Sequence, residues 1–149
     1  MIRPATPADL SALIELGKSM HAESVYSHLP FDAAKVSTLL VQLMNGSGCV
    51  FVAERDGRVI GGFAGGIAPH YFCDVLMAFD FALFVRKDKR GALAAAYLVE
   101  AYVDWALERG IDPRNIQLGI STGVDFERTA SFYSRMAFEQ VGGIFRMRG

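Results

Sequence analysis

The stretch that decides the fold is VRKDKRGALAAAYL, residues 85–98. It follows an apolar run at residues 76–84, carries four basic residues at positions 86–90, and becomes alanine-rich after Gly91. This change in character predicts a strand, a loop and then a helix. Free backbone N–H groups at a helix start favour an anion, and a glycine allows a phosphate to come close. We interpret the loop either as a pyrophosphate-binding loop or as a solvated basic turn.

The length and composition predict a single domain spanning residues 1–149. The chain has 149 residues, 52% of them hydrophobic, which is enough to bury one substantial core. Its formal net charge is −1, whereas a protein that coats nucleic acid is usually basic. We find no secretory signal and no uncharged run that reads as a membrane span. The two cysteines lack the Cys-x-x-Cys spacing, so we expect reduced cysteines in a cytoplasmic protein.

Hydrophobic periodicity predicts the elements on either side of this stretch. Helical spacing occurs at residues 7–23, 31–44, 90–109 and 127–136, and strand-like runs occur at residues 1–6, 49–54, 59–67, 76–85, 116–121 and 141–147. Thr6 is the predicted N-cap of the first helix, and Arg-Asp-Gly at residues 55–57 predicts a hairpin turn. Because the run at 76–85 is apolar on both faces, we expect it in the centre of the sheet.

The order of these elements predicts the fold class. Three consecutive strands indicate an antiparallel meander, and a long helix between two strands indicates a parallel crossover. We therefore expect an α/β (α+β) domain with a mixed, mostly antiparallel central sheet of about six strands and helices on both faces.

Common nucleotide and metal motifs do not explain the basic loop. The sequence contains no G-x-x-x-x-G-K-[ST] motif and no GxGxxG spacing around Gly91. His21, His28 and His70 are scattered and fit no ligand spacing, so we expect no metal site.

Three segments resemble the GNAT superfamily, the acetyl-CoA-dependent N-acetyltransferases. The superfamily's first strand and helix resemble the segment MIRPATPADLSALIEL. Its cofactor-binding strand, loop and helix resemble FALFVRKDKRGALAAAYLVEAYVDWALERG. Its last helix and strand resemble FYSRMAFEQVGGIFR. The similarity spans nearly the whole chain. The sequence departs from the superfamily's usual loop pattern at Asp88 and Leu93, and Ala137 stands where a glycine is common.

The resemblance implies where acetyl-CoA, as cosubstrate, would bind. It implies a sheet that splays between its two central strands, with the pantetheine arm along one strand and the pyrophosphate on amides at the start of the long helix. The residues implied for cofactor binding are Phe84, Val85, Arg90, Gly91, Ala92, Leu93, Ala94, Ala95, Ser121 and Thr122.

Two residues are candidates for catalysis. An amine with a pKa of ~10.4 is neutral in only about one part in 2,500 at pH 7, so a base or a water chain must accept its proton. Two carboxylates lie near enough in sequence to be that base, Asp80 inside an apolar run and Asp74 in the preceding loop, and we favour Asp80 because a lone carboxylate there is costly to bury. Alternatively, Asp80 is hydrogen-bonded to a neighbouring loop or faces solvent. The resemblance implies that Tyr133 protonates the departing thiolate, and the alternative is core packing. The loop at residues 70–72 is a candidate wall of the acceptor pocket.

The expected function is transfer of an acetyl group from acetyl-CoA to a primary amine by direct attack in a ternary complex. The acceptor would be a small molecule or a peptide, without nucleic-acid or membrane partners, and a homodimer is compatible with the composition. One alternative is a catalytically weak or inactive acyl-CoA-binding or structural domain with the same fold, suggested by the departures in the loop. Another is a nucleic-acid binder that uses residues 86–90, which the neutral charge balance disfavours.

Overall fold

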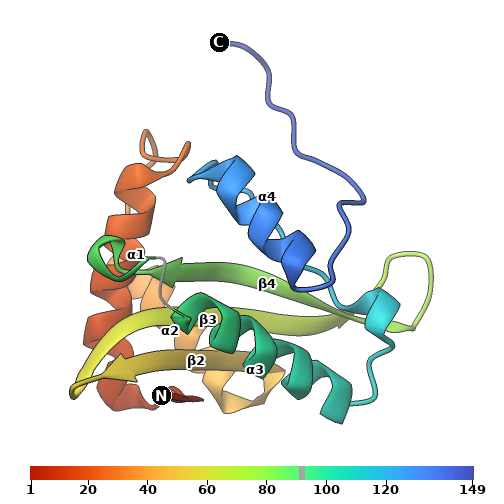
Figure 1. Ribbon diagram of the computed structural model, residues 1–149, viewed down its shortest axis with the longest axis horizontal. Coiled ribbons are helices and arrows are strands. Elements are labelled where there is room, and N and C mark those ends of the chain that lie inside the picture. The colour runs from red at the N-terminus through yellow and green to blue at the C-terminus, as the bar shows by residue number, and fades with distance from the viewer. Residues whose placement is uncertain (91–92) are drawn as a thin grey trace.

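A four-stranded antiparallel sheet forms the centre of the molecule. The computed structural model describes residues 1–90 and 93–149 (Figure 1). The strands lie in the order β1 (Ile2–Pro4), β2 (Gly48–Arg55), β3 (Arg58–Pro69) and β4 (Leu76–Val85). Asp56 and Gly57 both have positive φ, 52° and 73°, as the predicted two-residue hairpin between β2 and β3 requires.

Helices cover both faces of this sheet, as the sequence predicts. α1 (Leu10–Glu23) and α2 (Ala33–Gln42) pack on one face, and α3 (Ala94–Glu108) packs on the other (Figure 1). The buried side chains on the α1 side include Leu13, Leu16, Leu40, Val52 and Ala64. Those on the α3 side include Phe63, Leu98, Tyr102, Trp105 and Ile116.

A buried carboxylate joins the first strand to the first helix. The backbone N–H of Thr6 donates to Asp9 Oδ2 at 2.8 Å, and both terminal nitrogens of Arg3 donate to the same carboxylate at 2.8 and 2.9 Å. The Arg3 guanidinium lowers the pKa of Asp9 to about 2. Thr6 caps the 3-10 turn Pro7–Asp9, which leads directly into α1, so the predicted N-cap position is confirmed.

The predicted sheet of about six strands is wrong in number, because the runs at 116–121 and 141–147 form no strand in the part of the chain that the structure describes. Ile116 makes an isolated parallel bridge to Ala78, and the N–H of Gln117 donates to the carbonyl of Ala78 at 2.9 Å. The N–H of Gly119 then bonds to the side chain of Asp80 instead of to backbone, so the ladder does not continue. Consequently β4 lies at an edge of the sheet and not at its centre.

The C-terminal run at 141–147 has the apolar residues of a strand but pairs with no strand among the described residues. After α4 (Phe126–Arg135) the chain extends away from the body of the molecule (Figure 1). Val141, Phe145 and Met147 are 80%, 95% and 93% exposed. Arg146 Nη1 donates to the carbonyl of Val25 at 3.2 Å.

A β-bulge reorients the middle of β4. Ala64 pairs with Ala82 and Gly65 pairs with Asp80, which leaves Phe81 as an extra residue on β4. Bulges redirect side chains and are frequent beside active sites. Here the bulge places Asp80 on the α3 side of the sheet, as Gly65 is, and Phe81 on the α1 side.

No helix within residues 1–90 and 93–149 has the length and apolarity needed to cross a bilayer.

Candidate active site

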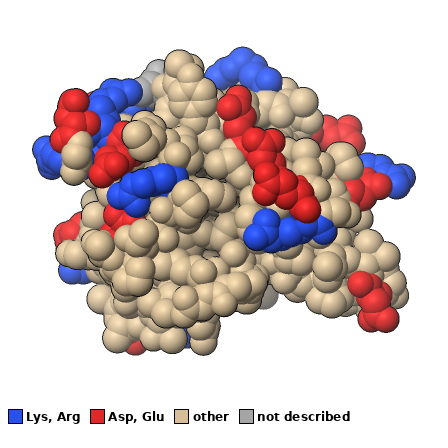
Figure 2. Space-filling model, turned by 90° about the horizontal axis from the view of Figure 1, so that it is seen from below, with Lys and Arg blue, Asp and Glu red and all other residues tan. Residues whose placement is uncertain are grey.

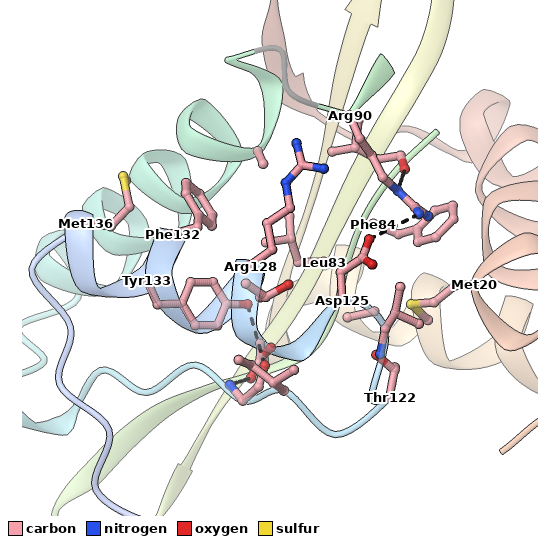
Figure 3. A pocket seen from close by; sticks show the side chains of 18 of the residues that line it. Met20, Leu83, Phe84, Arg90, Thr122, Asp125, Arg128, Phe132, Tyr133 and Met136 are labelled. Carbon is pink, nitrogen blue, oxygen red and sulfur yellow. Dashed lines mark hydrogen bonds and ion pairs between the residues drawn. The ribbon is translucent and has the colours of Figure 1, made fainter. Parts of the chain in front are cut away.

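A cavity of about 490 Å³ follows the unpaired edge of β4 beneath α4 (Figure 3). Residues 80–85 of β4 form one wall, and residues 119–122, which diverge from β4 after the bridge at Ala78, form the opposite wall. The first turn of α3 and the inward face of α4 complete it, and Met20 of α1 contributes from the other side of the sheet. The cavity therefore bends around the edge of β4 and touches both faces.

Asp80 and Tyr133 meet at a single residue, Gly119, inside this cavity. Asp80 Oδ1 accepts a hydrogen bond from the N–H of Gly119 at 2.9 Å. The hydroxyl of Tyr133, on α4, is 3.5 Å from the carbonyl oxygen of Gly119, and the Tyr133 side chain is buried (Figure 3). β4 and α4 thus place the two predicted catalytic residues in one site.

Burial raises the pKa of both side chains, Asp80 and Tyr133. Desolvation raises the pKa of Asp80 to about 6, and the hydrogen bond from Gly119 partly opposes that rise. Desolvation also raises the pKa of Tyr133, and the negative charge of Asp80 adds to this effect. Near pH 7 Asp80 is therefore mostly a carboxylate able to accept a proton, and Tyr133 is a phenol able to donate one.

Arg90 is held at the mouth of the cavity by a carboxylate. Its Nη1 and Nη2 donate to Glu23 at 2.9 and 2.7 Å, and its Nε donates to the carbonyl oxygen of Val85 at 3.0 Å. The guanidinium also lies 4.8 Å from the centroid of the Phe84 ring and 3.9 Å from Asp125 (Figure 3). The side chain predicted to help bind pyrophosphate is thus engaged by groups of the protein itself.

Most of the residues predicted from the sequence line the same cavity. They are Asp80, Phe84, Val85, Arg90, Leu93, Ala95, Ser121, Thr122 and Tyr133. Ala94 is instead buried in the core on the α3 side, and Gly91 and Ala92 lie outside the described residues. In an exposed loop, Tyr71 stacks on His70 and Phe72 is tilted against the same ring. Neither Tyr71 nor Phe72 is among the described residues that line the cavity.

Sequence reasoning missed the contribution of α4 and its preceding turn. Asp125, Arg128, Thr129, Phe132 and Met136 join Tyr133 in lining the cavity. Their spacing of three or four residues is the helical periodicity that places side chains on one face. This periodicity is visible in the sequence, but it does not show whether the face packs on the core or lines a cavity.

Tyr102 was also missed as a residue that positions the site. It is fully buried on α3, and its hydroxyl donates to the carbonyl of Gln117 at 2.8 Å. This bond fixes the segment that carries Gly119 to Thr122. Nothing in the helical pattern distinguishes Tyr102 from an ordinary core residue.

The surface gives no sign of a large charged interface on the face drawn in Figure 2. Lys and Arg side chains lie interspersed with Asp and Glu there, between wide uncharged areas. A protein that binds the phosphates of a nucleic acid concentrates positive charge on one surface.

Comparison with known proteins identifies the family. The model of the Acetyltransferase (GNAT) family matches residues 12–138. The chain belongs to the GNAT acetyltransferase family. This confirms the resemblance found in the sequence, and family and fold together support an acyltransferase.

Solved structures share the fold of this GNAT chain at low sequence identity. A putative acetyltransferase from Agrobacterium tumefaciens is 18% identical with a TM-score of 0.75, covering 100% of this chain and 99% of that one. An aminoglycoside 6'-N-acetyltransferase from Acinetobacter haemolyticus is 16% identical with a TM-score of 0.75, with coverage of 100% and 97%. A ribosomal-protein-alanine N-acetyltransferase from Brucella melitensis is 18% identical with a TM-score of 0.71, with coverage of 100% and 98%. No curated protein is significantly similar in sequence.

Proposed function

We propose that this protein transfers an acetyl group from acetyl-CoA to a primary amine by direct attack in a ternary complex. The observation that carries the proposal is the meeting of a buried carboxylate, Asp80, and a buried phenol, Tyr133, at Gly119 inside the cavity. In an acyltransferase fold, a proton acceptor and a proton donor at one point suit the exchange of an amine for a thiol.

The edge of β4 is suited to hold the pantetheine arm of acetyl-CoA. Beyond the bridge at Ala78, backbone groups of this edge face the cavity, and an amide-containing arm can add to them as a strand does. Phe84 and Val85 are the proposed contacts, with Ser121 and Thr122 on the opposite wall. Arg90 Nε already donates to the carbonyl oxygen of Val85, so the arm would share that oxygen with Arg90 or displace it.

The start of α3 is the proposed pyrophosphate site. Leu93 and Ala95 line the cavity where the amides of the first helical turn lack intrahelical partners. Gly91, Ala92 and Ala94 belong to the same proposed segment. Arg90 and Arg128 would supply positive charge next to it, and both side chains point into the cavity in Figure 3.

The proposed proton transfers balance the acetyl transfer. The amine nitrogen forms a bond to the thioester carbon, and the carbon–sulfur bond breaks. Asp80 accepts the proton that the amine nitrogen loses, directly or through one water, and Tyr133 donates its hydroxyl proton to the leaving sulfur. The products are an N-acetyl amine and the free thiol of CoA.

A second candidate function is acyl-CoA binding without efficient turnover. The engagement of Arg90 by Glu23 favours it, because the guanidinium is then unavailable to a diphosphate. The loop departures at Asp88 and Leu93 point the same way.

Two measurements separate these functions. At a hundred times its dissociation constant, acetyl-CoA stabilises a binding protein by about 2.7 kcal/mol, which a thermal shift detects. Thiol release from acetyl-CoA over a panel of amines then measures turnover. A thermal shift with thiol release supports the transferase, a shift without release across the panel supports the binding domain, and no shift contradicts both.

A further inference from the structure

We propose that the acceptor is a primary amine attached to an apolar, preferably aromatic, body, and not a polycation such as an aminoglycoside or a polyamine. This inference rests on the proposed function and concerns the part of the cavity on the α1 side of β4.

The bulge on β4 brings an aromatic surface to that side. A Cβ on Gly66 would lie 3.1 Å from the ring of Phe79 and 3.5 Å from that of Phe81, so both rings lie over Gly66. A Cβ on Gly62, four residues away on the same face of β3, would meet Leu13 of α1, which identifies this face as the α1 side. The two rings pack edge to face with centroids 5.4 Å apart. Phe81 lines the cavity and is 47% exposed, so part of its ring is available to a ligand.

The neighbouring walls are apolar as well. Met20 of α1 faces the cavity, and Ala82 and Phe84 lie on the same side of β4, where Phe84 belongs to the core packed under α1 and α2 (Figure 3). Together with Phe81 these residues define what we name the apolar chamber. An aliphatic or aromatic group placed in it loses contact with water on several sides.

The charges around the cavity disfavour a polycation. Among the described lining residues, Asp80 and Asp125 are acidic, whereas Arg90, Arg128 and Arg135 are basic. Asp125 lies 3.9 Å from Arg90, and Glu23, at the mouth, is bonded to the same guanidinium. Asp80 is on the α3 side, bonded to Gly119. A ligand with several ammonium groups would therefore be repelled by the arginines. The carboxylates would attract it only weakly, because they already bind groups of the protein.

The test compares three acceptors with acetyl-CoA as donor: 2-phenylethylamine, spermidine and kanamycin, an aminoglycoside. We expect kcat/KM for 2-phenylethylamine to exceed that for either polycation by about tenfold or more, as burial of an aromatic group predicts. Phe81→Ser should lower kcat/KM for 2-phenylethylamine by about tenfold, mainly through KM, and leave the thermal shift with acetyl-CoA unchanged. Met20→Gln, on the facing helix, should act in the same direction. Phe72→Ser, at a 79% exposed aromatic outside the cavity, is the matched control.

A second readout separates this inference from the proposed function. Ligand-observed NMR in the presence of CoA should detect binding of 2-phenylethylamine to the wild type and not to Phe81→Ser. If this binding is seen but no amine is acetylated, the apolar chamber stands and the proposed function fails. Preference for spermidine or kanamycin, or equal binding of 2-phenylethylamine to both proteins, would overturn the inference even if acetylation occurs.

Discussion

Arg90 and Glu23 form a two-point ion pair across the mouth of the cavity, with nitrogen–oxygen distances of 2.9 and 2.7 Å. The pair joins the end of α1 to the loop that precedes α3. It also fixes the guanidinium over the Phe84 ring and on the Val85 carbonyl. A diphosphate bound at the proposed site at the start of α3 would compete with Glu23 for the guanidinium, so the ion pair would oppose its binding.

Replacing Glu23 should therefore strengthen the binding of CoA. In Glu23→Gln the ion pair becomes a weaker hydrogen bond to a neutral amide, and one negative charge near the diphosphate is removed. Since a partly exposed ion pair contributes ~0.2–1 kcal/mol, we expect the dissociation constant for CoA to fall by up to about fivefold. Isothermal titration calorimetry measures this change. Glu15→Gln, on the exposed side of the same helix, is the control, and weaker binding in Glu23→Gln than in this control would contradict the competition.

Asp80 should make the folded state less stable as the pH rises from about 4 to about 6. Its pKa is raised to about 6 from an ordinary value of 3.8, so in this window the folded state binds more protons than the unfolded state. The contribution to the free energy of unfolding is on the order of 2 to 3 kcal/mol. In Asp80→Asn this contribution disappears.

Urea denaturation at pH 4 and pH 7 tests this expectation. Relative to the wild type, Asp80→Asn should gain stability on going from pH 4 to pH 7, whereas Asp74→Asn in the exposed β3–β4 loop should not. A constant difference between wild type and Asp80→Asn at the two pH values would show that the carboxylate titrates normally.

The sequence predicted the elements whose residues carry their own local signals. The boundaries of β4 match the apolar run at 76–85, and the hairpin at residues 55–57 follows from a turn that needs positive φ. The runs at 116–121 and 141–147 also have strand composition, but a strand requires a partner edge. Whether one is present depends on long-range packing, here on the bond between Gly119 and the Asp80 side chain.

The candidate site shows the same division. Asp80 and Tyr133 could be selected because each is unusual in its local context or in its position within a family pattern. The pairing of Arg90 with Glu23 joins residues far apart in the chain, and no local sequence pattern predicts it. The bulge at Phe81 is equally invisible in the sequence, because it is a mismatch in register between two strands.

The buried carboxylate of Asp9 should contribute measurably to stability. Asp9→Asn removes the ion pair with Arg3 and weakens the bond to the Thr6 amide, and we expect a loss of about 2 kcal/mol at pH 7. The pKa of Asp9 is lowered to about 2, so this stabilisation is present above about pH 4 and is lost as the pH falls toward 2. Denaturation curves at pH 7 and pH 3 measure both effects. Asp32→Asn, at the exposed cap of α2, should cost less, and an equal cost for the two variants would argue against a special role for Asp9.

The exposed C-terminal segment, residues 139–149, should promote self-association. Its four large apolar side chains, Val141, Ile144, Phe145 and Met147, are 69–95% exposed, and a contiguous exposed apolar segment of this kind favours pairing with a second copy. Light scattering over a range of concentrations should show a homodimer for the full chain and a monomer after removal of residues 139–149. Circular dichroism should show that the truncated chain remains folded. A full chain that stays monomeric at every concentration, or a truncated chain that unfolds, would contradict this expectation.

The most direct test of the central claim compares the wild type with Tyr133→Phe for two quantities, acetyl-CoA affinity by calorimetry and the rate of thiol release with a saturating amine. If Tyr133 donates the proton to the leaving sulfur, the dissociation constant should stay within about twofold while kcat falls by about 10²-fold or more. Tyr71→Phe, at an 86% exposed tyrosine away from the cavity, should change neither quantity. An unchanged kcat in Tyr133→Phe would contradict the account.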